Sequence, residues 1–168
     1  MTVSASVSYA VPAFEAKLCE PADLAVRIAQ LPRPLVFTNG CFDILHRGHV
    51  TYLAQARALG ASLIVAANSD ASVKRLGKGA DRPINRCTDR MALLAALESV
   101  TLVTWFDEDT PLQRILDARP DVLVKGGDWA IEKIVGYREV TGWGGQVHSI
   151  PFLHQSSTTA LVEKIRKL

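Results

Sequence analysis

The chain has 168 residues, enough to bury one good hydrophobic core but not two, so we expect a single domain. Hydrophobic residues make up 48% and charged residues 21%, which is ordinary for a globular protein and excludes a disordered, collagen-like or coiled-coil chain. The 19 basic residues exceed the 17 acidic ones by only two, so no general basic surface is expected, and nucleic acid is not an expected partner.

The three cysteines, Cys19, Cys41 and Cys87, lie far apart and form no CxxC pair. This spacing favours neither a zinc ribbon nor a disulfide framework, and it fits a reducing compartment. At the N-terminus no basic region is followed by an apolar run, so no signal peptide is expected. No apolar stretch approaches the length of a membrane span, so we expect a cytoplasmic protein with no membrane partner.

The first 33 residues differ in pattern from the rest, so we expect a boundary between 1–33 and 34–168. About the first twenty residues are small and polar with weak periodicity, which indicates an arm that orders on docking or a flexible tail. Apolar residues at helical spacing behind Pro21 then predict a short helix over 21–30, and two prolines end it.

From Leu35 onward, short apolar runs alternate with stretches of helical periodicity. The runs are continuous rather than alternating, which predicts strands that are buried on both faces. Strands are expected over 35–37, 63–67, 102–105, 122–124 and 147–150. Helices are expected over 49–59, stopped by Gly60; over 89–97, capped by Thr88; after Thr110 as cap and Pro111 as first residue; and over 158–167.

This alternation predicts the fold class, an α/β single domain with a Rossmann-like parallel sheet of about five strands flanked by helices. The crossovers between strands are expected to be right-handed. In such sheets, ligands bind beyond the carboxyl ends of the strands, where the strand order reverses. The loop after Phe37 is therefore the first place to look for chemistry.

The loop from Thr38 to His49 carries the strongest candidate site. It leaves a buried strand and enters a helix, where free N–H groups and the positive end of the helix dipole favour an anion. His46 and His49 are three residues apart at this helix start, so both imidazoles project to one side, and Gly48 lets a ligand approach the backbone. The alternatives are a helix turn without a ligand, or a metal site, which would need a third ligand and lacks an HExxH pattern.

Two further segments fall on the same expected edge of the sheet. After the strand over 122–124, Lys125 can pair with phosphate, and Gly126 and Gly127 permit close backbone approach, unless they form only a turn. The hydroxyls of 156–159 precede the last helix, where they form either a phosphate cradle or a simple N-cap.

A basic run follows the second expected strand. Its members are Lys74, Arg75, Lys78, Arg82, Arg86 and Arg90. A solvated basic loop and a phosphate-binding group are both open as interpretations of this run. Within it Arg90 is the strongest candidate, and Lys78 and Arg82 lie on a segment that could close over a substrate.

The residues His46-Arg47-Gly48-His49 match the HxGH signature, and the chain resembles the nucleotidylyltransferase superfamily that carries it. The resemblance implies that both imidazoles contact a triphosphate and stabilise charge while the α-phosphate is attacked in line, with no covalent intermediate. Residues 157–159 match the STT motif of that superfamily, which contacts the ATP phosphates. A P-loop is missing, and Gly77 and Gly79 do not complete a dinucleotide fingerprint.

A more specific resemblance, from about Leu35 to Leu168, is to adenylyltransferases that act on D-glycero-β-D-manno-heptose 1-phosphate. It rests on five segments together: TNGCFDILHRGH, NSDAS, DRP, FDEDTP and LVKGGD. It implies that ATP and the heptose phosphate give ADP-heptose and pyrophosphate for the lipopolysaccharide core, with Mg²⁺ bridging the ATP phosphates. The family is often fused to a sugar kinase, so a separate heptose kinase is expected here. Relatives commonly form homodimers, and we expect one.

On this resemblance we assign the site residues. The catalytic set is His46, His49 and Lys125. The nucleotide-binding set is Thr38, Asn39, Gly40, Cys41, Phe42, Gly48, Gly126, Asp128, Ser157, Thr158 and Thr159. The substrate-binding set is Asp43, Asn68, Lys78, Arg82 and Arg90, and for Asp43 an Asx turn in the loop is the alternative. No side chain is expected to bind the metal, which is held through phosphates.

Two rival functions remain, a cytidylyltransferase for a small phosphorylated alcohol such as glycerol 3-phosphate and a nucleotide-binding module without catalysis. Such cytidylyltransferases carry an RYVDE-like segment and an arginine-rich lead into STT, whereas this chain reads TWFDE and FLHQ there. The intact histidines and Lys125 argue against a module without catalysis. In one departure from the heptose family, His154-Gln155 replaces the usual glycine-containing lead into the STT motif, and Gln155 adopts positive φ less easily than glycine.

Overall fold

The computed structural model describes residues 10–77, 79, 81–154 and 157–168. Five strands form one sheet in the order β3-β2-β1-β4-β5, and every neighbouring pair is parallel. The strands are β1 (Leu35–Gly40), β2 (Ser62–Asn68), β3 (Leu102–Phe106), β4 (Val122–Gly126) and β5 (Gln146–Ile150). The predicted Rossmann-like α/β single domain is confirmed, and all five predicted strands are present with slightly wider bounds.

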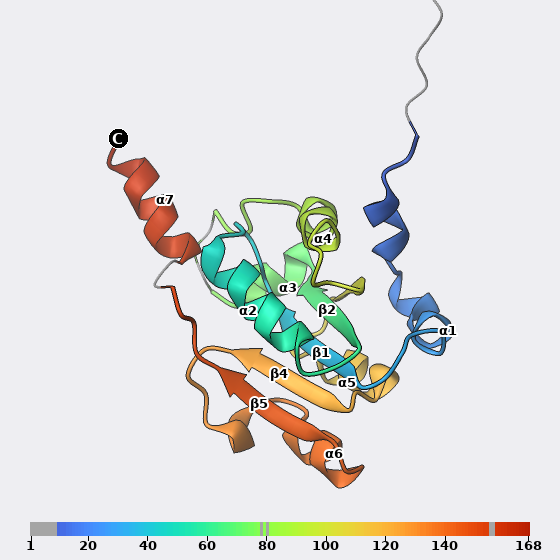
Figure 1. Cartoon of the computed structure of the whole chain (residues 1–168). Helices are drawn as coiled ribbons and strands as arrows, with labels where there is room; N and C mark the ends of the chain where they lie inside the picture. Colours follow the sequence, from blue (N-terminus) through green and yellow to red (C-terminus); the bar gives the residue numbers. More distant parts are fainter. Residues whose placement is uncertain (1–9, 78, 80, 155–156) are drawn as a thin grey trace, which may run out of the picture.

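Helices cover both faces of the sheet (Figure 1). In chain order they are η1 (Ala13–Lys17), η2 (Pro21–Asp23), α1 (Leu24–Ile28), α2 (Arg47–Arg57), α3 (Asp70–Arg75), α4 (Cys87–Ala95), α5 (Leu112–Ala118), η3 (Ile131–Lys133), α6 (Tyr137–Gly142) and α7 (Thr158–Arg166). The η segments are 3-10 turns. Within the described ranges, none of these helices is long and apolar enough to cross a membrane.

The sheet divides the buried core in two, because successive strand residues point to opposite faces. Leu35 and Phe37 of β1 pack beneath α1, α5 and α6. Val36, between them, packs beneath α2 and α4 on the other face. β2 is buried along its whole length, which is why its sequence is a continuous apolar run rather than an alternating one.

The described part of the N-terminal segment packs against the domain. The amide of Cys19 donates to the Val103 carbonyl at 2.9 Å, so the chain runs beside the edge strand β3. Leu24 and Ile28 of α1 are buried in the core on the α5 face. The predicted helix over 21–30 is present as η2 followed by α1, which is shorter than expected.

Three predicted helix boundaries are wrong. Thr88 does not cap α4, which begins at Cys87, because the Arg86 carbonyl already accepts the first helical hydrogen bond, from the amide of residue 90. Thr110 does not cap α5, since Pro111 itself holds the cap position. α2 begins at Arg47 rather than residue 49, and His46 is its N-cap.

Gly60 follows α2 and also packs closely against the chain before β1. α2 ends at Arg57, and a Cβ on Gly60 would collide with the Pro34 carbonyl oxygen. The glycine therefore allows close approach to the chain entering β1. Two helices of six residues each, α3 and α6, were not predicted, since they are too short to show a helical period.

Candidate functional site

The candidate site lies at the carboxyl ends of β1 and β4, where the strand order reverses. β1 pairs with β2 on one side and with β4 on the other, which makes this edge the expected ligand position. Three hollows open here, with volumes of about 460, 240 and 170 Å³. We call them the histidine hollow, the junction hollow and the lysine hollow.

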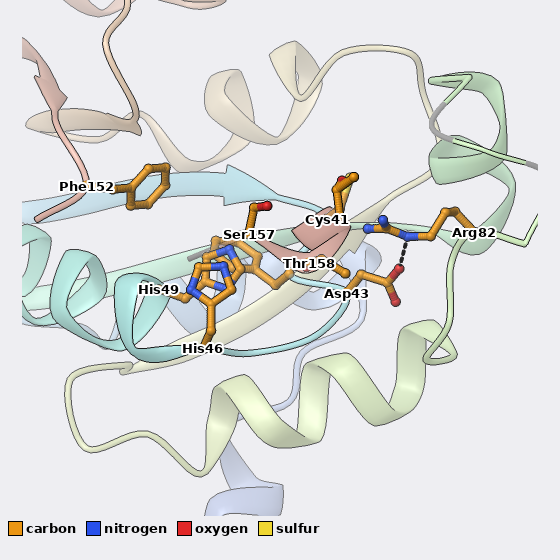
Figure 2. A pocket seen from close by; sticks show the side chains of 10 residues that line it. Cys41, Asp43, His46, His49, Arg82, Phe152, Ser157 and Thr158 are labelled. Atoms are coloured by element: carbon orange, nitrogen blue, oxygen red, sulfur yellow. Dashed lines mark hydrogen bonds and ion pairs between the residues drawn. The ribbon is translucent and has the colours of Figure 1, made fainter. Parts of the chain in front are cut away.

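The histidine hollow joins segments from the first and last thirds of the chain (Figure 2). The loop after β1 contributes both histidines, and the start of α7 contributes all three STT residues. Its lining residues are Cys41, Phe42, Asp43, His46, His49, Arg82, Phe152, Ser157, Thr158 and Thr159. Folding thus brings the HxGH and STT motifs to one hollow.

The two imidazoles lie against each other. Their ring centroids are 3.8 Å apart and their planes differ by 21°, so the rings are stacked. Nδ1 of His46 is buried and makes no hydrogen bond within the described part of the chain. A buried ring nitrogen without a partner is costly unless a ligand or water serves it.

Burial favours the neutral form of both imidazoles. It lowers the pKa of His46 below its usual value. For His49, burial first and the neighbouring His46 second lower the pKa to about 4, while the Ile44 carbonyl opposes this shift. A neutral imidazole can donate its ring N–H to an anion, and a bound anion favours the protonated form of the ring.

Gly48 and Gly40 make room for rings of the loop itself. A Cβ on Gly48 would lie 3.0 Å from Nδ1 of His46 and 3.2 Å from the His154 carbonyl oxygen. The His46 ring thus needs a glycine at residue 48, while the approach of a ligand to this backbone stays a prediction. A Cβ on Gly40 would lie 3.0 Å from the Phe42 ring, and Phe42 itself has φ of 47°.

The start of α7 lines the histidine hollow together with the two histidines. The Ser157 hydroxyl caps the helix by accepting from the Ala160 amide at 3.1 Å. The Thr158 hydroxyl donates to the Ile44 carbonyl at 3.4 Å, which ties the helix start to the loop that carries the histidines. The Ser157 hydrogen bond confirms the capping interpretation of the STT motif, and the phosphate cradle stays a prediction.

Asp43 holds Arg82 at the wall of the histidine hollow. Its carboxylate accepts from the Arg82 guanidinium, from the Ile84 amide at 2.8 Å and from the Asn85 amide at 2.9 Å. Burial alone would raise the pKa of Asp43, but these donors together lower it below its usual value. The carboxylate therefore binds groups of a distant segment of the protein. The sequence analysis considered an Asx turn and a substrate contact for Asp43, and neither includes these partners.

Arg90 is fully buried and lines none of the three hollows. Its guanidinium donates to the carbonyls of Cys41 at 2.6 Å, Asn68 at 2.7 Å and Asn85 at 3.0 Å, and to the Asp70 carboxylate at 2.8 Å. The structure therefore does not bring Arg90 to a substrate position, because protein oxygens occupy its donors.

Two other assigned residues lie behind the hollows. Thr38 is buried, and its hydroxyl is 2.5 Å from the Tyr52 hydroxyl, inside the core. The Asn68 amide donates to the Ser72 hydroxyl at 3.0 Å. Asp128 is exposed and lines none of the hollows. Three residues of the predictions lie outside the described residues: Lys78, Gln155 of the loop departure, and Ser156 of the hydroxyl run.

Lys125 and His49 both line the junction hollow, whereas only His49 also lines the histidine hollow. The junction hollow is lined by Asn39, Gly40, Cys41, Phe42, His49, Tyr52, Lys125, Gly126, Trp129 and Phe152. It shares His49 with the histidine hollow and Lys125 with the lysine hollow. The assigned catalytic residues therefore follow one another along a continuous edge.

The sequence reasoning missed two aromatic residues at this edge, Phe152 and Trp129. The Phe152 ring packs edge-on against His49 and Tyr52, with centroids 6.2 and 5.6 Å apart. A Cβ on Gly126 would lie 2.8 Å from this ring, so the glycine is required for the ring to cover the end of β4. An aromatic residue just past a predicted strand end was the available signal.

A family model described as cytidylyltransferase-like matches residues 37–164, which span the sheet, the histidine loop and most of α7. The chain belongs to the cytidylyltransferase-like family. Among solved structures, the lipopolysaccharide core biosynthesis protein of Thermoplasma volcanium is 26% identical, with a TM-score of 0.60 over 73% of this chain and 98% of that one. The pantoate-β-alanine ligase of Francisella tularensis, at 12% identity and a TM-score of 0.61 over 90% of this chain and 78% of that one, shares the fold alone.

Curated relatives narrow the family further. The D-β-D-heptose 1-phosphate adenylyltransferase of Bordetella bronchiseptica is 57% identical over 92% of this chain and 96% of its own length. The bifunctional protein HldE of Hahella chejuensis is 59% identical over 79% of this chain, which spans only 28% of that protein. This chain therefore belongs with the heptose 1-phosphate adenylyltransferases and is a nucleotidyltransferase.

Proposed function

We propose that this protein transfers the adenylyl group of ATP to D-glycero-β-D-manno-heptose 1-phosphate, giving ADP-heptose and pyrophosphate for lipopolysaccharide core biosynthesis. One observation carries the proposal: two stacked imidazoles and the N-terminus of α7 line one hollow, in a chain 57% identical to an enzyme named for this reaction. The 460 Å³ volume of that hollow falls within the range of small-molecule sites.

The reaction is a direct displacement at the α-phosphorus. An oxygen of the sugar phosphate forms a bond to the α-phosphorus, and the bond from that phosphorus to the bridging oxygen breaks, so pyrophosphate leaves with the electron pair. His46 and His49 donate hydrogen bonds to the triphosphate, and Lys125 stabilises the charge that develops between the two phosphates. The N–H groups at the start of α7 bind the leaving phosphates.

The remaining assigned residues hold this arrangement in place. Arg82 contacts the phosphates from the wall of the histidine hollow, where Asp43 fixes it. Asp43 and Arg90 are positioning residues, since each is occupied by several groups of the loops it joins. Fixed donors of this kind aid catalysis because they need no reorganisation during the reaction.

Mg²⁺ enters with ATP in this proposal. Within the described residues, no group of three or more His, Cys, Asp and Glu side chains could hold a metal ion, and the carboxylate in the histidine hollow is engaged by Arg82. Phosphate oxygens and water suit Mg²⁺, so the triphosphate would be its main ligand. When bound, the ion neutralises charge on the phosphates.

The proposed function implies an upstream enzyme and a cell compartment for this protein. A heptose kinase upstream supplies the sugar phosphate, and the reaction takes place in the cytoplasm, where ATP is available. We further propose a homodimer. The side chains of Ile165 and Leu168, at the end of the chain, are 63% and 99% exposed, and burial against a second copy would remove this apolar surface from water.

Pyrophosphate release with Mg²⁺ and the heptose 1-phosphate, measured with ATP, CTP, GTP and UTP in parallel, tests the function. We expect release with ATP alone, and a fall in kcat of about a hundredfold or more in His46→Ala and His49→Ala. Release with CTP and glycerol 3-phosphate would support the cytidylyltransferase alternative. Nucleotide binding without release from any pair of substrates would support the binding module.

A further inference from the structure

The lysine hollow opens on the face of the sheet opposite the histidines. Asn39 in β1 and Lys125 in β4 continue the alternation that places the apolar residues before them beneath α1, α5 and α6. Ile134, in the wall of the hollow, belongs to that same part of the core. α2, which carries His49, covers the other face. A molecule in the lysine hollow would therefore approach the junction from the opposite side to a triphosphate.

The lining of the lysine hollow suits a phosphorylated polyol. Its seven lining residues are Asn39, Pro111, Lys125, Trp129, Lys133, Ile134 and Val135. Two of them carry ammonium groups and none carries a carboxylate, so the hollow favours an anion. Asn39, an indole and three aliphatic side chains complete it, and the C–H face of a sugar ring packs well against the apolar part.

Trp129 is exposed but held in one orientation. Half of its surface is exposed, yet its indole N–H donates to the Gly126 carbonyl at 3.1 Å and its amide donates to the Ser149 hydroxyl at 3.0 Å. Ser149 in turn donates to the Gly127 carbonyl at 2.6 Å. A Cβ on Gly127, where φ is 116°, would lie 2.9 Å from the indole nitrogen, so the glycine makes room for the ring. A fixed, exposed indole offers a ready binding surface.

Size and connection decide which substrate the lysine hollow takes. At about 170 Å³ it is the smallest of the three hollows, so it has room for a sugar ring rather than for a whole nucleotide. It shares Asn39, Lys125 and Trp129 with the junction hollow, and the junction hollow reaches His49. Lys125, whose ammonium group also donates to the Asn39 carbonyl at 3.3 Å, therefore lies between the two sides.

We propose that the lysine hollow is the sugar-phosphate subsite, with Lys133 and the Trp129 indole as the residues that select a phosphorylated sugar as acceptor. The inference rests on the proposed function. The phosphate lies at the Lys125 end, beside the junction hollow, and the sugar ring lies against the indole. The predicted substrate contacts of Asn68 and Arg90 are replaced, because both side chains are occupied within the protein.

Steady-state kinetics on four variants of the full chain test the subsite. Lys133→Met and Trp129→Ala are each expected to raise the KM for heptose 1-phosphate about tenfold or more, since each removes one contact to that substrate alone. The KM for ATP stays unchanged in both. Trp129→Phe, which keeps an aromatic surface, recovers part of the loss. Lys164→Met on α7 is the control, because it removes the same charge from an exposed site that lines none of the hollows.

The indole N–H signals in a ¹⁵N–¹H spectrum give a second readout that does not depend on turnover. The chain has three tryptophans, so the Trp129 signal is assigned as the one lost in Trp129→Phe. We expect heptose 1-phosphate alone to shift this signal in the wild type. Weaker shifts in Lys133→Met at equal concentration would agree with the subsite.

The outcomes separate the two proposals. Wild-type turnover of heptose 1-phosphate, with its KM unchanged in Lys133→Met and Trp129→Ala, would overturn the subsite and leave the function standing. A KM that rises for ATP instead would assign the indole to the nucleotide base and also overturn it. A wild-type enzyme inactive with heptose 1-phosphate and every nucleotide would overturn the proposed function and the subsite with it.

Discussion

Replacing Arg90 is expected to weaken the fold around the site rather than the binding of one substrate. Its guanidinium joins the loop after β1, the end of β2, the start of α3 and the segment before α4 through four hydrogen bonds. A lysine keeps the charge but ends in a single ammonium group, which does not span acceptors on four segments. Arg90→Lys is therefore the sharpest perturbation, since it preserves charge while breaking the network.

The expected cost follows from the hydrogen bonds that lysine leaves unmade. If the ammonium group serves one or two of the four acceptors, two or three are lost. A buried acceptor left without a partner costs about 1–3 kcal/mol, so Arg90→Lys is expected to lower the free energy of unfolding by about 3 kcal/mol. For a chain of this size that corresponds to a fall in melting temperature of roughly 6–12 °C.

Urea unfolding followed by circular dichroism measures this loss, and initial-rate kinetics on the same protein measure its effect on the site. We expect kcat to fall, because the loop that carries both histidines loses the bond to the Cys41 carbonyl. Arg86→Lys is the matched control, since Arg86 is the N-cap residue of the same helix and is exposed. Unchanged stability together with a rise in the KM of one substrate alone would refute the reasoning and return Arg90 to a direct substrate contact.

Three further predictions concern the same loop. The pKa of His49 is lowered from 6.5 to about 4, so between these pH values the unfolded chain binds a proton that the folded chain does not. The free energy of unfolding should therefore fall by about 2–3 kcal/mol as the pH drops from 6.5 to 4. Urea unfolding of His49→Gln should lack this part of the pH dependence. Asp43→Asn removes the charge paired with buried Arg82, so we expect a loss of about 3 kcal/mol in unfolding free energy and a higher KM for ATP. Urea unfolding and ATP kinetics that both match the wild type would show that Asp43 does not hold Arg82 in place. Gly48→Ala should gain up to about 1 kcal/mol of helix propensity, offset by crowding of His46, while kcat falls about tenfold or more; a variant with full turnover would show that the ring does not need that space.

The sequence by itself determined the architecture and the place of the site. Continuous apolar runs such as 63–67 exist because a strand between two helical layers has no solvent face, and this local pattern is visible without any tertiary contact. The HxGH loop and the STT run were likewise readable, because each combines a short motif with a strand end or a helix start. Helix boundaries were less accurate, since the caps at Arg86 and Pro111 carry no side-chain hydrogen bond that their residue types would announce.

Only the tertiary structure decided which polar residues face a ligand and which hold the protein together. Arg82 and Arg90 come from one basic run, yet Arg82 lines a hollow and Arg90 is enclosed by carbonyls up to 49 residues away in sequence. The Asp43 carboxylate likewise pairs with Arg82, which lies 39 residues further along the chain. Trp129 reaches the same edge of the sheet as His49 only because β4 lies beside β1. Such partnerships depend on how distant strands pair, and local composition and periodicity carry no record of that pairing.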